Sequence, residues 1–201
     1  MIYCGFILEK TKYGFHLENY KLKRGRMMKK ILIVVDMQND FIDGSLGTKE
    51  AQNIVPNVAK KIKEYEKRGD RIIFTRDTHN EDYLMTSEGK KLPVEHCIYG
   101  THGWQIADGL DIKDCSHIDK STFGWRYWDS ELDNDDYNGK KIELIGLDTD
   151  ICVISNALIL KATFPDADIT VDASCCAGVT PETHKAAIET MKMCQINVIG
   201  E

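Results

Sequence analysis

Short runs of aliphatic and β-branched residues alternate along this chain with longer amphipathic segments. Such alternation is typical of a parallel sheet whose strands are connected by crossover helices. The runs predict six strands, at residues 31–35, 71–75, 116–119, 142–146, 168–171 and 196–199. We therefore expect an α/β fold, a three-layer α/β/α Rossmann-like single domain with a mainly parallel six-stranded sheet.

The amphipathic segments between these runs predict the helices. We expect helices at about residues 51–68, 150–162 and 181–194, with a further one at 125–132. Thr180 can cap the helix that follows it, and Pro181 suits a first helical turn because its missing N–H is not needed there. Residues 129–138 are acidic and loop-like, which indicates a connection and not a domain boundary.

The first 27 residues differ from the rest of the chain. They have neither helical periodicity nor strand alternation, and they end in the basic stretch KLKRGR. We interpret residues 1–27 as an N-terminal extension, either a start codon assigned too early, with Met27 or Met28 as the true start, or a flexible basic arm. Residues 28–201 form the predicted α/β domain.

The charge and the cysteine content limit which binding partners and which cellular compartment we expect for this protein. Residues 1–30 hold eight basic and two acidic side chains, so the remainder holds eighteen basic and thirty acidic ones, a net charge of −12. An acidic body argues against nucleic acid as a partner. Seven cysteines without a disulfide spacing favour reduced thiols and a cytoplasmic location. No apolar run approaches the roughly 20 residues of a membrane helix, so we expect no membrane partner.

Candidate chemistry gathers immediately after the predicted strands. In parallel sheets ligands bind beyond the carboxyl ends of the strands, and these positions hold Asp36, Asp77, Lys120 and the segment 148–152. Cys152 near a helix N-terminus would have a stabilised thiolate, with Asp36 as its base and Lys120 as a neighbouring cation. In the alternative interpretation Cys152 is a small core residue, Asp36 caps a turn and Lys120 is a solvated lysine.

A second cluster follows the second predicted strand. Asp77, His79, Glu88 and His96 lie within twenty residues and could together bind a divalent metal, with Zn, Fe or Mn all compatible. The alternative is a polar loop with two ordinary histidines, because an Asp-x-His pair is common. The spacing by itself favours the polar loop, since the gap to His96 is also long.

Several short motifs resemble those of the isochorismatase-like cysteine hydrolases, in the order of that family. Any one of them is a weak signal, but the set is specific and extends from about residue 28 to the end. The motifs are VDMQNDF at 35–41, RDTH at 76–79, PVEHC at 93–97, GTHG at 100–103, KSTF at 120–123 and GLDTDICV at 146–153.

The resemblance implies roles for these residues. Asp36, Lys120 and Cys152 correspond to the catalytic triad of the family, and the backbone amides of Asp148 and Cys152 to its oxyanion hole. A cis peptide is usual in the family at the bond that joins Leu147 to Asp148 here. Phe41 corresponds to one aromatic wall of the substrate pocket.

Within the family the chain is most similar to nicotinamidases. Their metal ligands match Asp77, His79 and His96, and some members use a Glu where Glu88 stands. Two positions depart from the usual pattern: Tyr83 replaces a His found in many members, and Leu92 replaces an aromatic residue of the pocket wall.

The activity implied by this resemblance is hydrolysis of nicotinamide to nicotinate and ammonia, a step of NAD salvage, with a divalent metal, most simply Zn, as cofactor. We expect a small-molecule amide as the partner and a homo-oligomer as one form of the protein. The alternatives are a related amidase acting on a carbamoyl or ureido compound, and a non-catalytic binding protein of the same fold. A vinyl ether hydrolase is disfavoured because that chemistry needs no nucleophilic cysteine.

Overall fold

A computed structural model describes residues 30–110, 115–132 and 140–201. Its centre is a parallel sheet with the strand order β3-β2-β1-β4-β5-β6. Every described strand pair is parallel, which confirms the predicted fold class. The strands are β1 (Ile31–Val35), β2 (Arg71–Asp77), β3 (Ser116–Lys120), β4 (Lys141–Leu147), β5 (Asp168–Ala177) and β6 (Asn197–Ile199).

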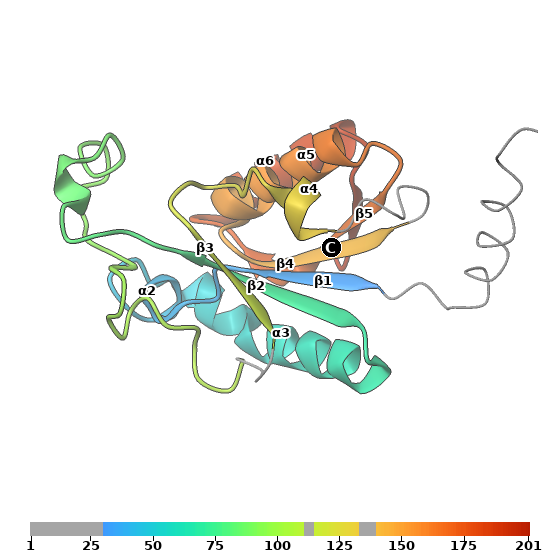
Figure 1. Cartoon of the computed structure of the whole chain (residues 1–201), viewed down its shortest axis with the longest axis horizontal. Helices are drawn as coiled ribbons and strands as arrows, with labels where there is room; N and C mark the ends of the chain where they lie inside the picture. The colour runs from blue at the N-terminus through green and yellow to red at the C-terminus, as the bar shows by residue number, and fades with distance from the viewer. Residues whose placement is uncertain (1–29, 111–114, 133–139) are drawn as a thin grey trace, which may run out of the picture.

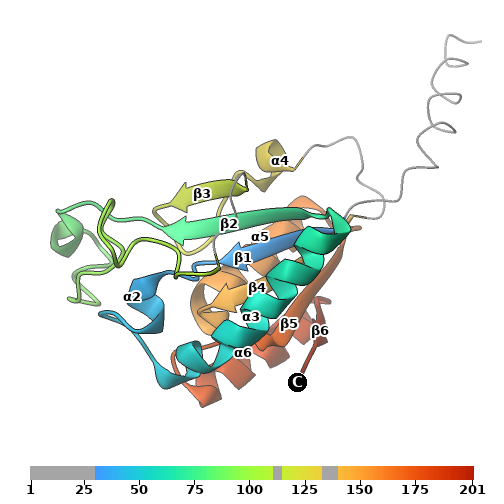
Figure 2. The same ribbon diagram turned by 90° about the horizontal axis from the view of Figure 1, so that it is seen from below.

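Helices cover both faces of the sheet, as the three-layer prediction requires. The long helix α3 (Lys49–Arg68) lies on one face together with the short α2 (Asn39–Ile42) (Figure 1). On the other face lie α4 (Trp128–Glu131), α5 (Ile154–Thr163) and α6 (Pro181–Met193) (Figure 2). A 3-10 turn at Tyr83–Met85 and a π turn at Thr149–Val153 complete the described helical segments.

The central strand β1 explains why the core has two halves. All five of its residues are buried, and alternate side chains point to opposite faces of the sheet. Ile31, Ile33 and Val35 pack in the core beneath α5 and α6, whereas Leu32 and Val34 pack in the core beneath α3. An uninterrupted apolar run is the pattern expected of a strand covered by helices on both sides.

Helix ends follow their local sequence signals. Thr180 accepts a hydrogen bond from the backbone of Thr183 in a capping box, and Pro181 occupies the first turn of α6, as predicted. Thr48 likewise accepts from the Ala51 amide, so α3 begins at Lys49, two residues before the predicted start. Gly69 ends α3 with φ 69°, a left-handed conformation that costs glycine little.

The fifth strand, predicted at 168–171, continues to Ala177. Two predicted helices also differ from the structure. The expected helix at 125–132 is only the single turn α4, because Trp125 and its neighbours are held by side-chain bonds to α5. The helix expected from residue 150 begins as the π turn and becomes regular only at Ile154. The predicted extension at 1–27 and part of the acidic loop at 129–138 lie outside the described residues.

No helix among the described residues is both long enough and apolar enough to cross a membrane.

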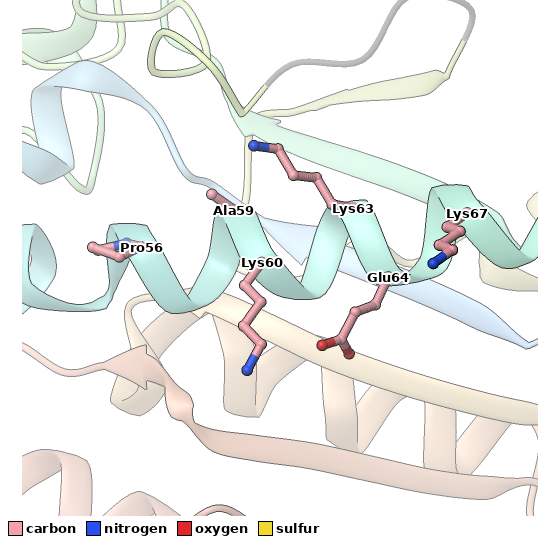
Figure 3. A pocket seen from close by; sticks show the side chains of 6 residues that line it. All are labelled: Pro56, Ala59, Lys60, Lys63, Glu64 and Lys67. Carbon is pink, nitrogen blue, oxygen red and sulfur yellow. The ribbon is translucent and has the colours of Figure 1, made fainter.

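An open hollow of about 430 Å³ lies along the outer side of α3, lined by Pro56, Ala59, Lys60, Lys63, Glu64 and Lys67 (Figure 3). None of the residues that line this hollow belongs to the predicted triad or to the predicted metal cluster.

A partly buried polar network connects the inner side of α3 to the sheet. The Lys61 ammonium lies 2.6 Å from a carboxylate oxygen of Glu143 and 2.7 Å from one of Asp172. The Tyr65 hydroxyl donates to Glu143 at 2.6 Å, and the Ser174 hydroxyl donates to Asp172 at 2.6 Å. Burial acts to raise the pKa of Asp172, but its bonds from Lys61 and Ser174 outweigh burial and lower that pKa.

We expect Asp172→Asn to lower the free energy of unfolding at neutral pH by about 1–3 kcal/mol, because Lys61 and Ser174 lose a buried charged partner. A carboxyl whose pKa is lower in the folded state stabilises the fold above its unfolded pKa of about 3.9. That stabilisation is lost as the pH falls through the lower folded pKa, so the difference between variant and parent should shrink in acid. Urea unfolding across this pH range measures it, with exposed Asp166→Asn as the matched control. An equal loss in both variants would contradict the assignment.

Candidate active site

The carboxyl ends of four adjacent strands bring the predicted site residues to one rim of the sheet. Asp36 follows β1, Asp77 ends β2, Lys120 ends β3, and Cys152 lies in the π turn after β4. Asp36, Lys120 and Cys152 are 0%, 1% and 4% exposed, so Lys120 is not the solvated lysine of the alternative interpretation.

The Lys120 ammonium is the common neighbour of this group. Its Nζ lies 2.6 Å from Asp36 Oδ2, 3.5 Å from Cys152 Sγ and 3.6 Å from Asp77 Oδ1. A lysine can donate three hydrogen bonds, and here three site residues share one cation. The predicted triad and the predicted metal cluster therefore meet at a single buried charge.

Asp36 is held in place by Thr75, a buried residue of β2 that the sequence did not single out. The Thr75 hydroxyl donates to Asp36 Oδ1 at 2.6 Å, and the Asp36 amide donates to the Thr75 carbonyl at 3.2 Å. Asp36 itself has φ 47°, in the left-handed region that non-glycine residues seldom adopt. Such backbone strain persists only where surrounding structure enforces it, and it concentrates at functional sites.

Burial and charge set the protonation states of the triad. Burial raises the pKa of Asp36, and Lys120 offsets only part of that shift. Burial also raises the pKa of the Cys152 thiol, again opposed by Lys120. Burial alone would lower the pKa of Lys120, but Asp36, Cys152 and Asp77 raise it overall. A lysine cation thus lies between a thiol and a carboxyl whose pKa values are both raised.

Cys152, the predicted nucleophile, lies in the π turn and not in the first turn of a regular helix. The Val153 amide donates to the Asp148 carbonyl at 3.0 Å, a bond five residues back along the chain. π turns inside helices are frequent at functional sites. The predicted helix-terminus environment of Cys152 is therefore present in a modified form.

The expected cis peptide between Leu147 and Asp148 is wrong for this structure, since no described peptide bond is cis. A trans bond is the lower-energy form for a residue that is not proline, and Asp148 adopts an ordinary extended conformation at the end of β4. The oxyanion hole of the Asp148 and Cys152 amides stays a prediction.

The Asp148 side chain is a titratable group of the site that we did not predict. Burial, with Asp150 and Asp36 nearby, raises the pKa of its carboxyl to about 7.

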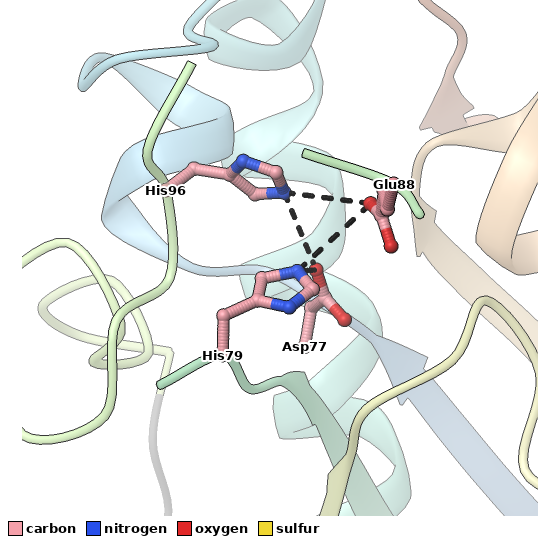
Figure 4. Close-up of side chains that lie close together, drawn as sticks. All are labelled: Asp77, His79, Glu88 and His96. Carbon is pink, nitrogen blue, oxygen red and sulfur yellow. Dashed lines mark hydrogen bonds and ion pairs between the residues drawn. The ribbon is translucent and has the colours of Figure 1, made fainter. Parts of the chain in front are cut away.

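The four predicted metal ligands converge in space. One ligand atom from each of Asp77, His79, Glu88 and His96 lies within 4.8 Å of the others (Figure 4). Asp77 Oδ2 is 2.9 Å from His79 Nε2 and 3.5 Å from His96 Nε2, and Glu88 Oε1 is 3.9 Å from each imidazole. This arrangement is closer than a polar loop with two unrelated histidines would require.

Supporting contacts orient these ligands. The Nδ1 of His96 lies 2.8 Å from the Val94 carbonyl, which leaves Nε2 directed into the cluster. A metal-binding histidine commonly donates its other ring nitrogen in this way. Burial acts to raise the pKa of Asp77, but His79 and His96 lower it overall. The residues therefore fit a divalent metal, with two imidazoles and two carboxylates as donors.

Aromatic rings surround the cluster. The ring centroid of Tyr83, at the position where the family resemblance implies a histidine in many members, lies 4.6 Å from that of His79 and 4.9 Å from that of His96. The Tyr83 hydroxyl donates to the Leu92 carbonyl. Tyr83 therefore supports the ligands sterically and offers them no nitrogen. Phe41 is buried with its ring 5.6 Å from that of His96, which places the predicted pocket wall next to the metal ligands.

Two polar residues of the VDMQNDF motif hold the site together, although we did not predict a role for them. The Gln38 amide group accepts from the Asp77 backbone N–H at 2.7 Å and donates to the Asp77 carbonyl at 2.8 Å. Asp40 accepts from the Cys97 amide at 2.7 Å, one residue after His96. Their position beside Asp36 was the only sequence signal available for either role.

The sequence comparison agrees with this geometry. Residues 30–200 match the model of the isochorismatase domain. The chain belongs to the isochorismatase family. It is 30% identical to a probable inactive nicotinamidase of Arabidopsis thaliana, over 80% of this chain and 87% of that protein. It is 23% identical to the nicotinamidase of Saccharomyces cerevisiae, over 86% of this chain and all of that protein.

Solved structures give the same assignment. The pyrazinamidase of Pyrococcus horikoshii in complex with zinc superposes with a TM-score of 0.69 and 27% identity, covering 86% of this chain and 99% of that one. Together with the family match, these relatives support the predicted class of enzyme, an amidohydrolase.

We expect Glu88→Gln to weaken zinc binding by at least about tenfold, because even indirect partners of a metal site commonly contribute 10- to 100-fold to affinity. Glu95→Gln is the matched control, since Glu95 is exposed on the same loop and one residue before His96. Competition with a chromophoric chelator measures both affinities. Equal zinc affinities for the two variants would remove Glu88 from the ligand set.

Proposed function

We propose that this chain hydrolyses nicotinamide to nicotinate and ammonia through a thioester on Cys152. The observation that carries the proposal is the position of Lys120, within 3.6 Å of Asp36, Cys152 and Asp77. The nucleophile and the metal cluster are thus near enough for one small planar amide to reach both. Relatives described as nicotinamidase and pyrazinamidase support this choice of substrate.

In the first half of the reaction, Asp36 removes the proton of the Cys152 thiol and the sulfur attacks the carboxamide carbon. The ammonium of Lys120 stabilises the thiolate while it forms, since burial otherwise raises the pKa of that thiol. The negative charge then moves to the carbonyl oxygen, which the amides of Asp148 and Cys152 would stabilise. Asp36 returns its proton to the departing nitrogen, so ammonia leaves and an acyl thioester remains.

In the second half, Asp36 takes a proton from a water molecule that attacks the thioester carbon. The carbon–sulfur bond breaks, the carboxylic acid is released, and Cys152 regains its proton from Asp36. The balance is one amide and one water consumed for one acid and one ammonia produced. The group that carries the proton in each step is the same buried carboxylate.

Asp77, His79, Glu88 and His96 would hold the divalent metal, for which zinc is our choice. When bound, the metal supplies a fixed positive centre for the pyridine nitrogen, directly or through water, which orients the ring so that its carboxamide faces Cys152. Phe41 supplies an apolar face for the same ring. A cytoplasmic location accords with a site that depends on a reduced thiol.

Purified wild-type protein should release ammonia from nicotinamide, and prior treatment with a chelator should abolish that release. Cys152→Ala should reduce turnover by at least about 10³-fold and leave zinc content unchanged, because a nucleophile carries most of the catalysis in such triads. The exposed Cys194→Ala is the matched control and should retain full activity. Substantial turnover by Cys152→Ala would overturn the nucleophile assignment.

If the zinc-loaded wild type releases no ammonia from nicotinamide, the substrate assignment is wrong. Other small amides should then be tested as substrates. Carbamoyl and ureido compounds come first among them, because Leu92 is 38% exposed where many relatives have an aromatic pocket wall.

The pH profile should show the raised pKa of Asp36. Asp36 must be deprotonated to act as a base, so kcat/KM falls as the pH drops through its pKa in the free enzyme. Because burial raises that pKa, we expect the acid limb to lie above the ordinary aspartate value of about 3.9. Steady-state kinetics with zinc content measured at every pH tests this, since metal loss would otherwise imitate the limb. A limb at or below the ordinary value would contradict the proposed base.

A further inference from the structure

Asn156 is a fully buried polar residue on α5, one helical turn after Cys152. Its Nδ2 donates to the carbonyl of Cys152 at 2.9 Å and to the carbonyl of Phe123 at 3.3 Å. Its Oδ1 accepts from the backbone N–H of Trp125 at 2.9 Å and from the indole N–H of Trp128 at 3.1 Å. None of these partners is an amidase site residue except Cys152.

The four bonds use the whole capacity of the side chain. A carboxamide has two N–H groups to donate and two lone pairs to accept with. The two partners of Nδ2 are carbonyls and the two partners of Oδ1 are N–H groups, so the partners settle which way the amide faces. A buried side chain with every bond made is rigid, and it fixes the groups around it.

These bonds join the two segments that carry the reacting groups. Phe123 and Trp125 belong to the loop that leaves β3 immediately after Lys120, and Cys152 lies in the π turn after β4. The loop is seated tightly on α5, since a Cβ on Gly124 would lie 2.5 Å from Ile159 Cδ1 and 3.2 Å from Ser155 Cβ. Asn156 therefore ties the loop after Lys120 to the turn that bears the nucleophile.

The hydrogen bond from Asn156 to the Cys152 carbonyl lies where the backbone hydrogen-bonding pattern changes from π turn to α-helix. Val153 and Ile154 donate five residues back, to Asp148 and Thr149, before α5 continues as a regular helix. The π turn is a local departure from regular helix geometry. A side-chain donor on the Cys152 carbonyl fixes the orientation of that peptide, and with it the direction in which the Cys152 side chain leaves the backbone.

We propose that Asn156 is a positioning residue for the nucleophile. Its hydrogen bond to the Cys152 carbonyl holds the Cys152 sulfur in its position 3.5 Å from the Lys120 ammonium. This inference rests on the proposed function in that it takes Cys152 as the nucleophile. It adds to that function a residue that never contacts substrate. The effect is expected on the reactivity of the sulfur and not on substrate affinity.

A pair of small variants isolates the one bond. Asn156→Ala removes all four hydrogen bonds, whereas Asn156→Ser keeps a hydroxyl that can bond to the carbonyl four residues back, which is that of Cys152. Both variants lose the contacts of the carboxamide with Phe123, Trp125 and Trp128. The comparison of alanine with serine therefore reports on the Cys152 bond at nearly equal side-chain volume.

We expect Asn156→Ala to lower kcat for nicotinamide by about 10- to 100-fold with KM changed by less than about threefold, as a shift of about 1 Å in a reacting group would cause. Iodoacetamide labelling of Cys152, followed by peptide mass spectrometry across a range of pH, should slow in parallel. Asn156→Ser should restore both rates to within about threefold of wild type. The exposed Cys194 is the internal reference and should label equally in every variant.

Equal losses in the alanine and serine variants, or wild-type rates in both, would overturn the proposal. If Asn156→Ala does not fold, Asn156→Ser decides alone: rates near wild type support the proposal, and a loss above about tenfold refutes it. If the wild type does not hydrolyse nicotinamide, the substrate assignment fails, but the labelling rates still test Asn156. If wild-type Cys152 labels no faster than Cys194, the nucleophile assignment fails first.

Discussion

The buried ion pair of Lys120 with Asp36 is the interaction on which the rest of the site depends. A lysine ammonium and a carboxylate in the interior are stable only as partners, because removing either leaves an uncompensated buried charge. The pair lies 2.6 Å apart at the ends of two strands separated by β2 in the sheet. Its geometry therefore requires that β1, β2 and β3 keep their register, and that the connection after each strand leave the rim in the right direction.

The shared cation also links the two halves of the proposed chemistry. Lys120 lies 3.5 Å from the Cys152 sulfur and 3.6 Å from Asp77, whose other carboxylate oxygen faces the two histidines. A change in charge on one side is felt on the other across a few ångströms of low-dielectric interior. In the proposed function, this electrostatic coupling explains why the nucleophile and the metal ligands lie so close together.

Around this centre the protein uses uncharged side chains as clamps. Thr75 holds Asp36, Gln38 holds the end of β2, and Asn156 holds the Cys152 carbonyl. Each is fully buried and bonded to backbone, and Thr75 and Asn156 also bond to side chains. Buried polar groups that find all their partners make a structure more specific, because any displacement would leave them unpaired. The rigidity of the site thus comes from residues that take no part in the proposed reaction.

The sequence by itself determined the strands, the principal helices and the residues that would meet at the rim. Apolar runs, the Thr180 and Pro181 cap, and the rule that parallel strands end together at one edge are local or topological signals, and they indicated Asp36, Asp77, Lys120 and Cys152. Only the tertiary structure decided that Lys120 is buried, that Cys152 lies in a π turn, and which side chains hold the site residues in place. Thr75 is 39 residues from Asp36, and Asn156 is 33 residues from Phe123. Such contacts depend on sheet register and on packing between layers, which no local pattern in the sequence encodes.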